Sequence, residues 1–295
     1  MPSPTTESLP NHEAVDTLPA PGAASFMLDS QLAALASVRD AISDIVRAAE
    51  VMADAIRSGN RLIYAAAGSS GLMALADACE IPGTFGVPSR AIRIHMAGGI
   101  PSDGHMPGAT EDDEDSALRV AGDVQTGDAV ILLSASGTTP YALAVARSAR
   151  AKGGTVIGIA NNPGSKLLDM ADISICLATP AEVIAGSTRL GAGTAQKAAL
   201  NMVSSLMGIM LGHVHDGQMV NVVADNAKLV KRAAGMVARI SNVSGADAEG
   251  ALHHTRGDIK AAILVARGCT PEAAKELLKT HDGQLKRCLQ SLTTT

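Results

Sequence analysis

The chain has 295 residues, a formal net charge of −5 and 46% hydrophobic residues, but only two tyrosines, two phenylalanines and no tryptophan. That length suffices for one large or two modest domains with a substantial core. Proteins that bind nucleic acids usually carry basic patches and stacking rings, so this composition argues against a nucleic-acid partner. The four cysteines form no CxxC pair, which argues against a zinc site and against a disulfide framework.

No segment near the N-terminus combines basic residues with an apolar core, and no apolar run has the length of a membrane span. We therefore expect a cytoplasmic protein without a membrane partner. Residues 1–27 carry five of the thirteen prolines and little periodicity, so we expect an extended N-terminal arm. Residues 28–242 should form the main domain. Residues 243–295, where glycines break short helical segments, should form a small helical domain.

Five runs rich in apolar and β-branched residues predict buried strands. They lie at 61–66, 91–96, 129–133, 155–160 and 172–176. Apolar spacing predicts helices at 28–58, 72–80, 141–147, 194–211 and 225–240. The strand runs are apolar throughout rather than alternating, which is typical of a parallel sheet with helices on both faces. We therefore expect an α/β fold, a doubly wound parallel five-stranded sheet with a small C-terminal helical domain.

The segment Ala67-Gly68-Ser69-Ser70-Gly71, here called the first loop, joins the first strand to a helix. Hydroxyls and glycines at the start of a helix build an anion site, because the free N–H groups of the first turn and the helix dipole attract negative charge. We expect Ser69, Ser70 and Gly71 to contact an anionic ligand. The segment matches neither a Walker motif nor the GxGxxG pattern of dinucleotide-binding proteins.

The segment 134–140, here called the second loop, reads Ser-Ala-Ser-Gly-Thr-Thr-Pro and repeats this chemistry after the third strand. The hydroxyl groups of Ser134, Ser136 and Thr139 can donate hydrogen bonds, and Gly137 lets the backbone approach a ligand. Alternatively, the serines and threonines only cap the following helix. Ligands of parallel sheets bind at the carboxyl ends of the strands, where both loops fall, so the two loops together favour a phosphate site.

The pattern Ser-x-Ser-Gly-x-Thr in the second loop resembles the phosphosugar-binding loop of the sugar isomerase (SIS) fold. Over nearly its whole length the chain resembles the N-acetylmuramic acid 6-phosphate etherase family, in short motifs that keep their order. These motifs lie at 6–8, 61–64, 67–71, 77–80, 84–87, 97–99, 111–112, 134–141, 186–189, 192–197, 200–202, 219–220 and 226–229. The tail from Gly245 also resembles that family's C-terminal helical domain.

The resemblance implies an enzyme that cleaves the ether between D-lactate and C3 of a phosphosugar without cofactor or metal. A base removes the proton at C2, lactate leaves, and water adds to the unsaturated intermediate. The family's two acid–base glutamates fall at Glu80 and Glu111. Without the resemblance, Glu80 reads as an ordinary carboxylate at a helix end and Glu111 as part of a solvated charge run. The implied substrate contacts are Ser69, Ser70, Gly71, Ser134, Ser136, Gly137, Thr138, Thr139, Arg189 and Lys197.

The resemblance also implies a homodimer with shared active sites, and the apolar helical segments 32–56 and 202–211 are the surfaces expected to pair. The chain departs from the family where cations usually stand: Leu72 and Thr138 replace arginine, and Gly191 replaces lysine. The segment 107–112 also differs, although it retains Glu111. These departures leave the phosphosugar scaffold in place and leave open which phosphosugar is the substrate.

Three functions therefore remain open from the sequence. The first is a lyase of the etherase type. The second is a sugar-phosphate isomerase of the same fold, for which one carboxylate base between C1 and C2 suffices. The third is a non-catalytic sensor, because a related animal protein uses this scaffold to sense sugar phosphates and control a kinase. Retention of both Glu80 and Glu111 favours an enzyme.

Overall fold

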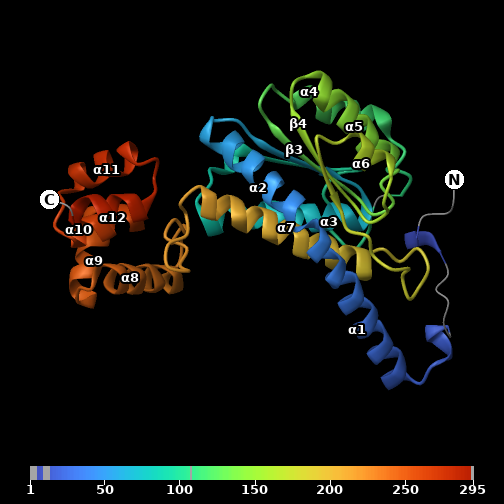
Figure 1. Cartoon of the computed structure of the whole chain (residues 1–295), viewed down its shortest axis with the longest axis horizontal. Helices are drawn as coiled ribbons and strands as arrows, with labels where there is room; N and C mark the ends of the chain where they lie inside the picture. Colours follow the sequence, from blue (N-terminus) through green and yellow to red (C-terminus); the bar gives the residue numbers. More distant parts are fainter. Residues whose placement is uncertain (1–4, 9–13, 107, 294–295) are drawn as a thin grey trace. The chain divides into compact units, whose positions relative to one another are not determined.

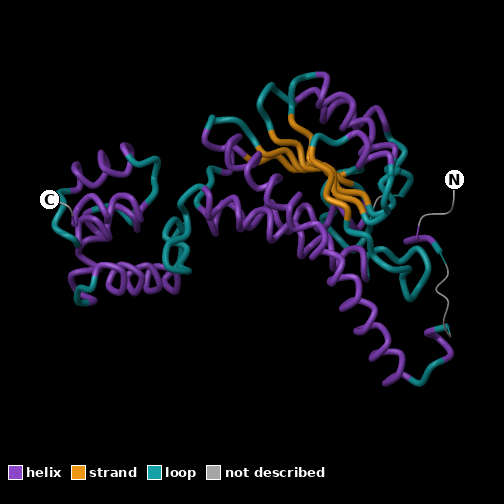
Figure 2. Tube along the Cα trace, in the orientation of Figure 1, coloured by secondary structure: helices purple, strands orange, loops and turns teal. Residues whose placement is uncertain are grey.

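In the computed structural model of the chain, which describes residues 5–8, 14–106 and 108–293, five strands form one parallel sheet. Its strands are β1 (Leu62–Ala66), β2 (Ile92–Met96), β3 (Ala129–Ser134), β4 (Thr155–Ala160) and β5 (Ile173–Cys176). The spatial order is β2-β1-β3-β4-β5, and every neighbouring pair is parallel. Figure 2 shows the strands side by side between two layers of helices. The expected doubly wound parallel five-stranded sheet is thereby confirmed.

Helices cover both faces of this sheet (Figure 1). One face carries α4 (Glu114–Asp123), α5 (Pro140–Ala151) and α6 (Lys166–Met170), and the other carries α2 (Ile42–Arg57), α3 (Gly68–Phe85) and α7 (Gly191–Met210). Every residue of the central strands β1 and β3 is buried, and all of β4 but its first residue, whereas the edge strands β2 and β5 include half-buried residues. Burial on both faces explains why these strands read as continuous apolar runs.

The helix expected at 28–58 is wrong in its extent. The structure has α1 (Ala20–Ala36), a 3-10 turn (Ser37–Ala41) and α2, so α1 begins inside the expected arm. Pro21 fits in the first turn of α1, where its missing N–H removes no helical hydrogen bond. The Ser37 hydroxyl donates to the Ala34 carbonyl at 2.7 Å, a local bond that competes with a continuous helix.

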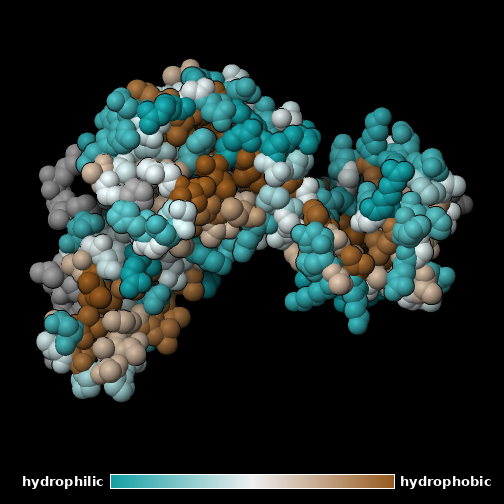
Figure 3. Space-filling view, turned by 180° about the vertical axis from the view of Figure 1, so that it is seen from behind, coloured by the Kyte–Doolittle hydropathy of each residue, from teal (hydrophilic) through white to brown (hydrophobic). Residues whose placement is uncertain are grey.

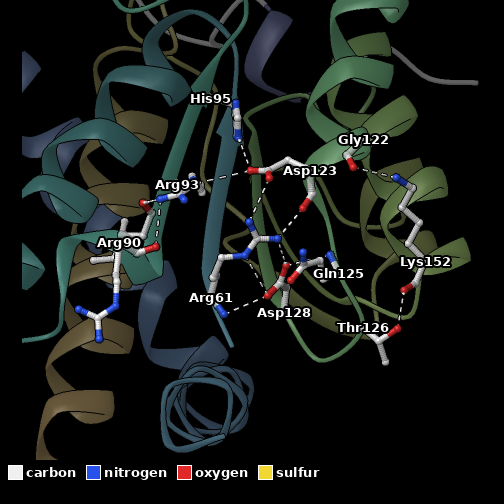
Figure 4. Close-up of polar contacts among 11 residues, drawn as sticks. Arg61, Arg90, Arg93, His95, Gly122, Asp123, Gln125, Thr126, Asp128 and Lys152 are labelled. Atoms are coloured by element: carbon white, nitrogen blue, oxygen red, sulfur yellow. Dashed lines mark hydrogen bonds and ion pairs between the residues drawn. The ribbon is translucent and has the colours of Figure 1, made fainter. Parts of the chain in front are cut away.

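A buried ion pair joins the amino ends of β1 and β3 (Figure 4). The Arg61 guanidinium donates to Asp128 Oδ2 at 2.7 Å and to Asp123 Oδ1 at 3.0 Å, and Asp128 is 1% exposed. The hydrogen bond to Asp128 raises the pKa of Arg61 above its usual value. These groups lie at the edge of the sheet opposite the carboxyl ends of the strands, so their role is to hold β1 against β3.

The described residues divide by their contacts into two units. The first unit lies within Met1–Ala78 and Arg90–Leu206, and the second lies within Cys79–Ser89 and Met207–Thr295. This division differs from the expected boundary at residue 243, because α8 (Ala227–Ser241) packs in one apolar cluster with the tail. The tail helices are α9 (Gly245–His254), α10 (Ile259–Ala266), α11 (Pro271–Thr280) and α12 (Leu285–Thr293). Side chains cap the starts of several of them, such as Ser244 for α9 and Asp258 for α10.

A buried cation stabilises the second unit. Lys260 is 6% exposed, and its ammonium donates to the carbonyls of Gly283 at 3.0 Å and Gly212 at 3.3 Å. Burial lowers the pKa of Lys260 to about 8. Burial and the charge of Lys260 lower the pKa of the nearby His213 to about 4. His213 is therefore neutral at neutral pH.

Within the described ranges, no helix combines the length and the apolar character needed to cross a membrane.

Candidate functional site

The two serine-rich loops lie at the topological switch point of the sheet, between β1 and β3. The first loop follows β1 and leads into α3 on one face, whereas the second follows β3 and leads into α5 on the other. Because β1 and β3 are adjacent and parallel, and the chain leaves their carboxyl ends towards opposite faces of the sheet, the two loops start side by side at one end of the sheet. This is the position at which open α/β sheets bind ligands.

Hydrogen bonds inside the second loop fix its shape. Ser134 Oγ accepts from the Gly137 N–H at 3.0 Å and lies 2.8 Å from Thr139 Oγ1. Ser136 Oγ accepts from the Thr138 N–H at 3.2 Å and from its hydroxyl at 3.0 Å. Thr139 is the N-cap residue of α5, yet its side chain makes no capping bond. Capping alone therefore does not account for these hydroxyls, and they organise a compact turn before the helix.

Only glycine fits at position 137 of this turn. Gly137 has a φ of +69°, and a Cβ there would lie 2.1 Å from Ser165 Oγ and 2.4 Å from Ser165 Cβ. The Gly137 carbonyl also accepts from the Leu167 N–H at 2.9 Å. The residues after β4, at the start of α6, thus pack against the second loop and hold its backbone.

Asn161 and Asn162, in the turn after β4, form hydrogen bonds to the second loop and to the N-terminal segment. These contacts could not be inferred from the sequence. The Asn161 N–H donates to the Ala135 carbonyl at 3.0 Å, and Asn162 Nδ2 donates to that carbonyl at 2.8 Å and to Thr6 Oγ1 at 3.1 Å. Thr6 is completely buried, and its carbonyl accepts from the Gly186 N–H. The sequence Asn-Asn-Pro-Gly-Ser at the end of a strand was the available signal, and it predicts a turn but not these partners.

The first loop places its residues at the beginning of α3, which starts at Gly68 with a φ of +54°. Ser69 and Ser70 lie in the first turn, where backbone N–H groups have no intrahelical acceptor. Ser70 is buried and Ser69 half-buried. A Cβ at Gly71 would lie 2.9 Å from the Met96 side chain, so glycine permits close packing of α3 on β2.

Glu111 lies beside Gly68 of the first loop, and its side chain is exposed. A Cβ at Gly68 would lie 2.9 Å from Glu111 Oε1, and the Glu111 carbonyl accepts from the Tyr141 N–H of α5 at 2.9 Å. Its neighbours in the acidic run have ordinary roles: Asp113 caps α4 at the Ser116 N–H, and Glu114 pairs with an arginine of α5. The fold thus fixes the backbone of Glu111 and places its exposed carboxylate beside the first loop.

Four further expected site residues, Arg189, Lys197, Thr138 and Glu80, are exposed like Glu111. Arg189 lies in the turn before α7, and Lys197 lies on α7, where its ammonium donates to Asn201 Oδ1. Thr138 is exposed at the tip of the second loop. Glu80 lies on the part of α3 that groups with the second unit and is also exposed. The contacts of the first unit therefore bring Glu111, but not Glu80, to the loops.

The three positions where the family usually carries cations differ in their surroundings. Leu72 is 36% exposed and Thr138 is exposed. Gly191 is buried, and a Cβ there would lie 3.0 Å from Ala34 Cβ. The Glu182 carboxylate accepts from the N–H groups of Gly191 and the next residue, at 2.8 Å each, and so occupies the N-terminus of α7. Among the described residues, no three potential ligands gather as a metal site.

The class of protein follows from this fold and from the comparisons. The family model of the SIS domain matches residues 104–211. A solved protein of E. coli CFT073 superposes with a TM-score of 0.51 at 18% identity, covering 68% of this chain and 97% of its own. The chain thus has the SIS fold.

Curated relatives define the family more narrowly. The N-acetylmuramic acid 6-phosphate etherase of Deinococcus radiodurans is 37% identical over 289 residues, covering 97% of this chain and 94% of the relative. That of Salmonella typhimurium is 38% identical over 282 residues, with 94% of each chain covered. The chain belongs to the N-acetylmuramic acid 6-phosphate etherase family.

Proposed function

We propose that this protein cleaves the lactyl ether of N-acetylmuramic acid 6-phosphate by elimination and hydration, releasing D-lactate and N-acetylglucosamine 6-phosphate. The observation that carries the proposal is the placement of Glu111, whose carboxyl oxygen lies against Gly68 while its backbone is tied to the start of α5. A carboxylate is thus available beside two loops suited to a phosphate. Family membership over nearly the whole chain supports the same reaction.

The phosphate is bound by the two loops. The N-terminal turn of α3 supplies backbone N–H groups, and α3 and α5 supply the positive ends of two helix dipoles. Ser69, Ser70, Ser136, Thr138 and Thr139 supply hydroxyls around them. Ser134 is nearly buried and already bonded to the Gly137 N–H, so its main contribution is to shape the second loop.

Two glutamates share the acid–base work. The C2 proton is acidic when C1 is an open-chain aldehyde, and a carboxylate removes it. The electron pair then forms the C2–C3 double bond as the C3–O bond breaks, and a carboxylic acid protonates the departing lactate oxygen. Water adds to C3 and a proton returns to C2. We assign the C2 proton to Glu111, because it lies at the loops, and the leaving oxygen to Glu80.

Lactate release from N-acetylmuramic acid 6-phosphate tests the activity, and glutamine variants test the roles. General acid–base groups typically contribute about 10²–10⁴-fold, so Glu80→Gln and Glu111→Gln should each lower turnover by about that factor. Glu80→Gln should still exchange the C2 hydrogen with solvent deuterium, whereas Glu111→Gln should not. Parent turnover in both variants would refute the mechanism, and isomerisation of fructose 6-phosphate without lactate release would point to an isomerase.

We also propose a homodimer with shared active sites. Along α1 and α2 a line of apolar side chains is exposed, with Leu28 at 58%, Leu32 at 55% and Ile42 at 44%. Figure 3 shows this apolar surface on α1, and a groove of about 380 Å³ continues it to Met202 of α7. Such a surface matches a second copy of the same chain. Light scattering should give twice the chain mass, and a monomeric mass at micromolar concentration would refute the dimer.

The substrate class also supports a cytoplasmic location, because a sugar with an ionised phosphate and an ionised lactyl carboxylate does not cross a bilayer unaided.

A further inference from the structure

A buried carboxylate lies at the centre of a polar cluster that the proposed mechanism does not use. Asp77 of α3 is 3% exposed. Its Oδ2 accepts from the Tyr64 hydroxyl at 3.0 Å, and its Oδ1 accepts from Asn201 Nδ2 at 3.1 Å and from Ser204 Oγ at 2.8 Å. The donors come from β1 and α7, so the cluster joins three elements of the first unit. A buried carboxylate needs such donors, because burial without them is costly.

Chemistry dictates the orientation of the Asn201 amide. An ionised carboxylate only accepts hydrogen bonds, so the NH₂ group of Asn201 must face Asp77. Its carbonyl oxygen then faces away from the cluster. That oxygen accepts from the ammonium of Lys197, one helical turn earlier on α7. The buried Asp77 carboxylate thus fixes the orientation of the Asn201 amide, and the amide oxygen in turn fixes the position of the exposed Lys197 ammonium.

The turn of α7 that carries Lys197 is tied to the second loop. Gln196 Nε2 donates to Asn161 Oδ1 at 2.9 Å, and the Asn161 N–H donates to the Ala135 carbonyl. Asp77 lies on α3, the helix that begins at the first loop. Lys197 is exposed and one of its three N–H donors is engaged, so the others are available to a ligand.

The Tyr64 phenol keeps its proton across physiological pH. Burial and the neighbouring Asp77 carboxylate raise the pKa of Tyr64 well above its usual value. The phenol therefore remains a donor. Tyr64 and Ser204 provide donors to the two oxygens of Asp77 without help from Asn201. Asn201 is the member of the cluster that also reaches outward.

We propose that Asp77 and Asn201 are positioning residues that hold the Lys197 ammonium in place for an oxygen of the bound phosphosugar. The proposal rests on the proposed function, because it assigns Lys197 to that ligand. A lysine side chain loses substantial rotamer freedom when it is fixed. Fixing it before the ligand arrives reduces the entropy lost on binding and orients the donor.

Two variants separate positioning from a merely structural role. Asn201→Leu and Ser204→Ala each delete one hydrogen bond to the same oxygen of Asp77, but only Asn201 contacts Lys197. We expect Asn201→Leu to weaken binding of N-acetylglucosamine 6-phosphate, measured by calorimetry, by about 10-fold and to lower kcat/KM for lactate release by about 10- to 100-fold. Ser204→Ala should stay within about threefold of the parent in both. Thermal unfolding of both variants should show similar, small losses.

A double-mutant cycle with Lys197→Met completes the test. In that background Asn201→Leu should have almost no further effect, because its role is exercised through Lys197. Equal losses in both backgrounds, or an equal loss in Ser204→Ala, would overturn the proposal. If Asn201→Leu does not fold, Asn201→Ala deletes both contacts of the amide without adding apolar bulk, and should show the same loss.

The binding measurements keep the two proposals apart. A parent protein that binds N-acetylglucosamine 6-phosphate but releases no lactate refutes the etherase activity, while the binding cycle still decides the role of Asn201. A parent protein that releases lactate but shows additive losses in the cycle refutes the positioning role alone.

Discussion

Replacing Gly68 by alanine tests whether the position of Glu111 in the structure is the one used in catalysis. The new Cβ would lie 2.9 Å from Glu111 Oε1, whereas ordinary contacts begin at 3.4 Å. The carboxyl group must therefore withdraw by about 0.5 Å, which a flexible side chain can do at little cost in stability. A displacement of about 1 Å can lower a rate by about 10²-fold, so half of it should lower kcat by about 10-fold.

The backbone contributes a separate effect that needs a control. Gly68 has a φ of +54°, where an alanine costs about 1–2 kcal/mol. Gly59 follows α2 with a φ of +77°, and a Cβ there would meet nothing within 4 Å. Gly59→Ala therefore carries a similar backbone cost without touching the site.

Steady-state lactate release and urea unfolding of the two variants separate these effects. Both variants should lose about 1–2 kcal/mol of unfolding free energy. Only Gly68→Ala should lose turnover. A Gly68→Ala protein with the parent kcat, or equal losses of kcat in both variants, would show that the contact between Gly68 and Glu111 has no bearing on catalysis.

Three further predictions concern the second loop, the second unit and the amino edge of the sheet. Ser136→Ala should weaken binding of a sugar phosphate by about 10- to 150-fold and leave the unphosphorylated sugar unaffected, whereas equal losses in calorimetry would assign the loop a structural role. Burial lowers the pKa of His213 from 6.5 to about 4, so the unfolded chain binds the extra proton and stability falls as the pH drops from 6.5 towards 4. Denaturant unfolding should show a loss of about 2 kcal/mol between pH 7 and pH 5 that His213→Gln reduces and His254→Gln, at an exposed site, does not. Asp128→Ala leaves Arg61 without its buried partner and should cost about 3 kcal/mol in urea unfolding, with kcat of the remaining folded protein unchanged because the pair lies at the amino edge.

The sheet could be predicted from the sequence because burial on both faces leaves a local signal. All five strands lie within one residue of their expected bounds, and both loops follow β1 and β3 as expected. The helix at 28–58 could not be delimited, because its apolar spacing continues through the 3-10 turn at Ser37–Ala41. The spacing of apolar residues indicates which face of a helix is buried, but it does not reveal one 3-10 turn between two α-helices.

The polar contacts that build the site could not be predicted in the same way. Asp77 meets Asn201 across 124 positions, and Thr6 meets Asn162 across 156. Such pairs carry no periodic signal, because each partner is one polar residue in an otherwise ordinary segment. Family motifs marked several of these residues, but only the directions of the hydrogen bonds assign them roles.

Leu72, Thr138 and Gly191 stand where the family resemblance implies basic side chains, so Lys197 is more important for binding an anionic ligand in the proposed site. Gly191 has a structural reason: α1 packs against it, and Glu182 already occupies the N–H groups at the start of α7. No comparable constraint acts on Leu72 or Thr138, which are both exposed. A site that keeps the negative charge of its glutamates but has fewer cations attracts an anionic phosphosugar less strongly at long range. We infer that its affinity depends more on short, well-directed hydrogen bonds, and the proposed role of Lys197, held by a buried carboxylate through one amide, is to supply such a bond.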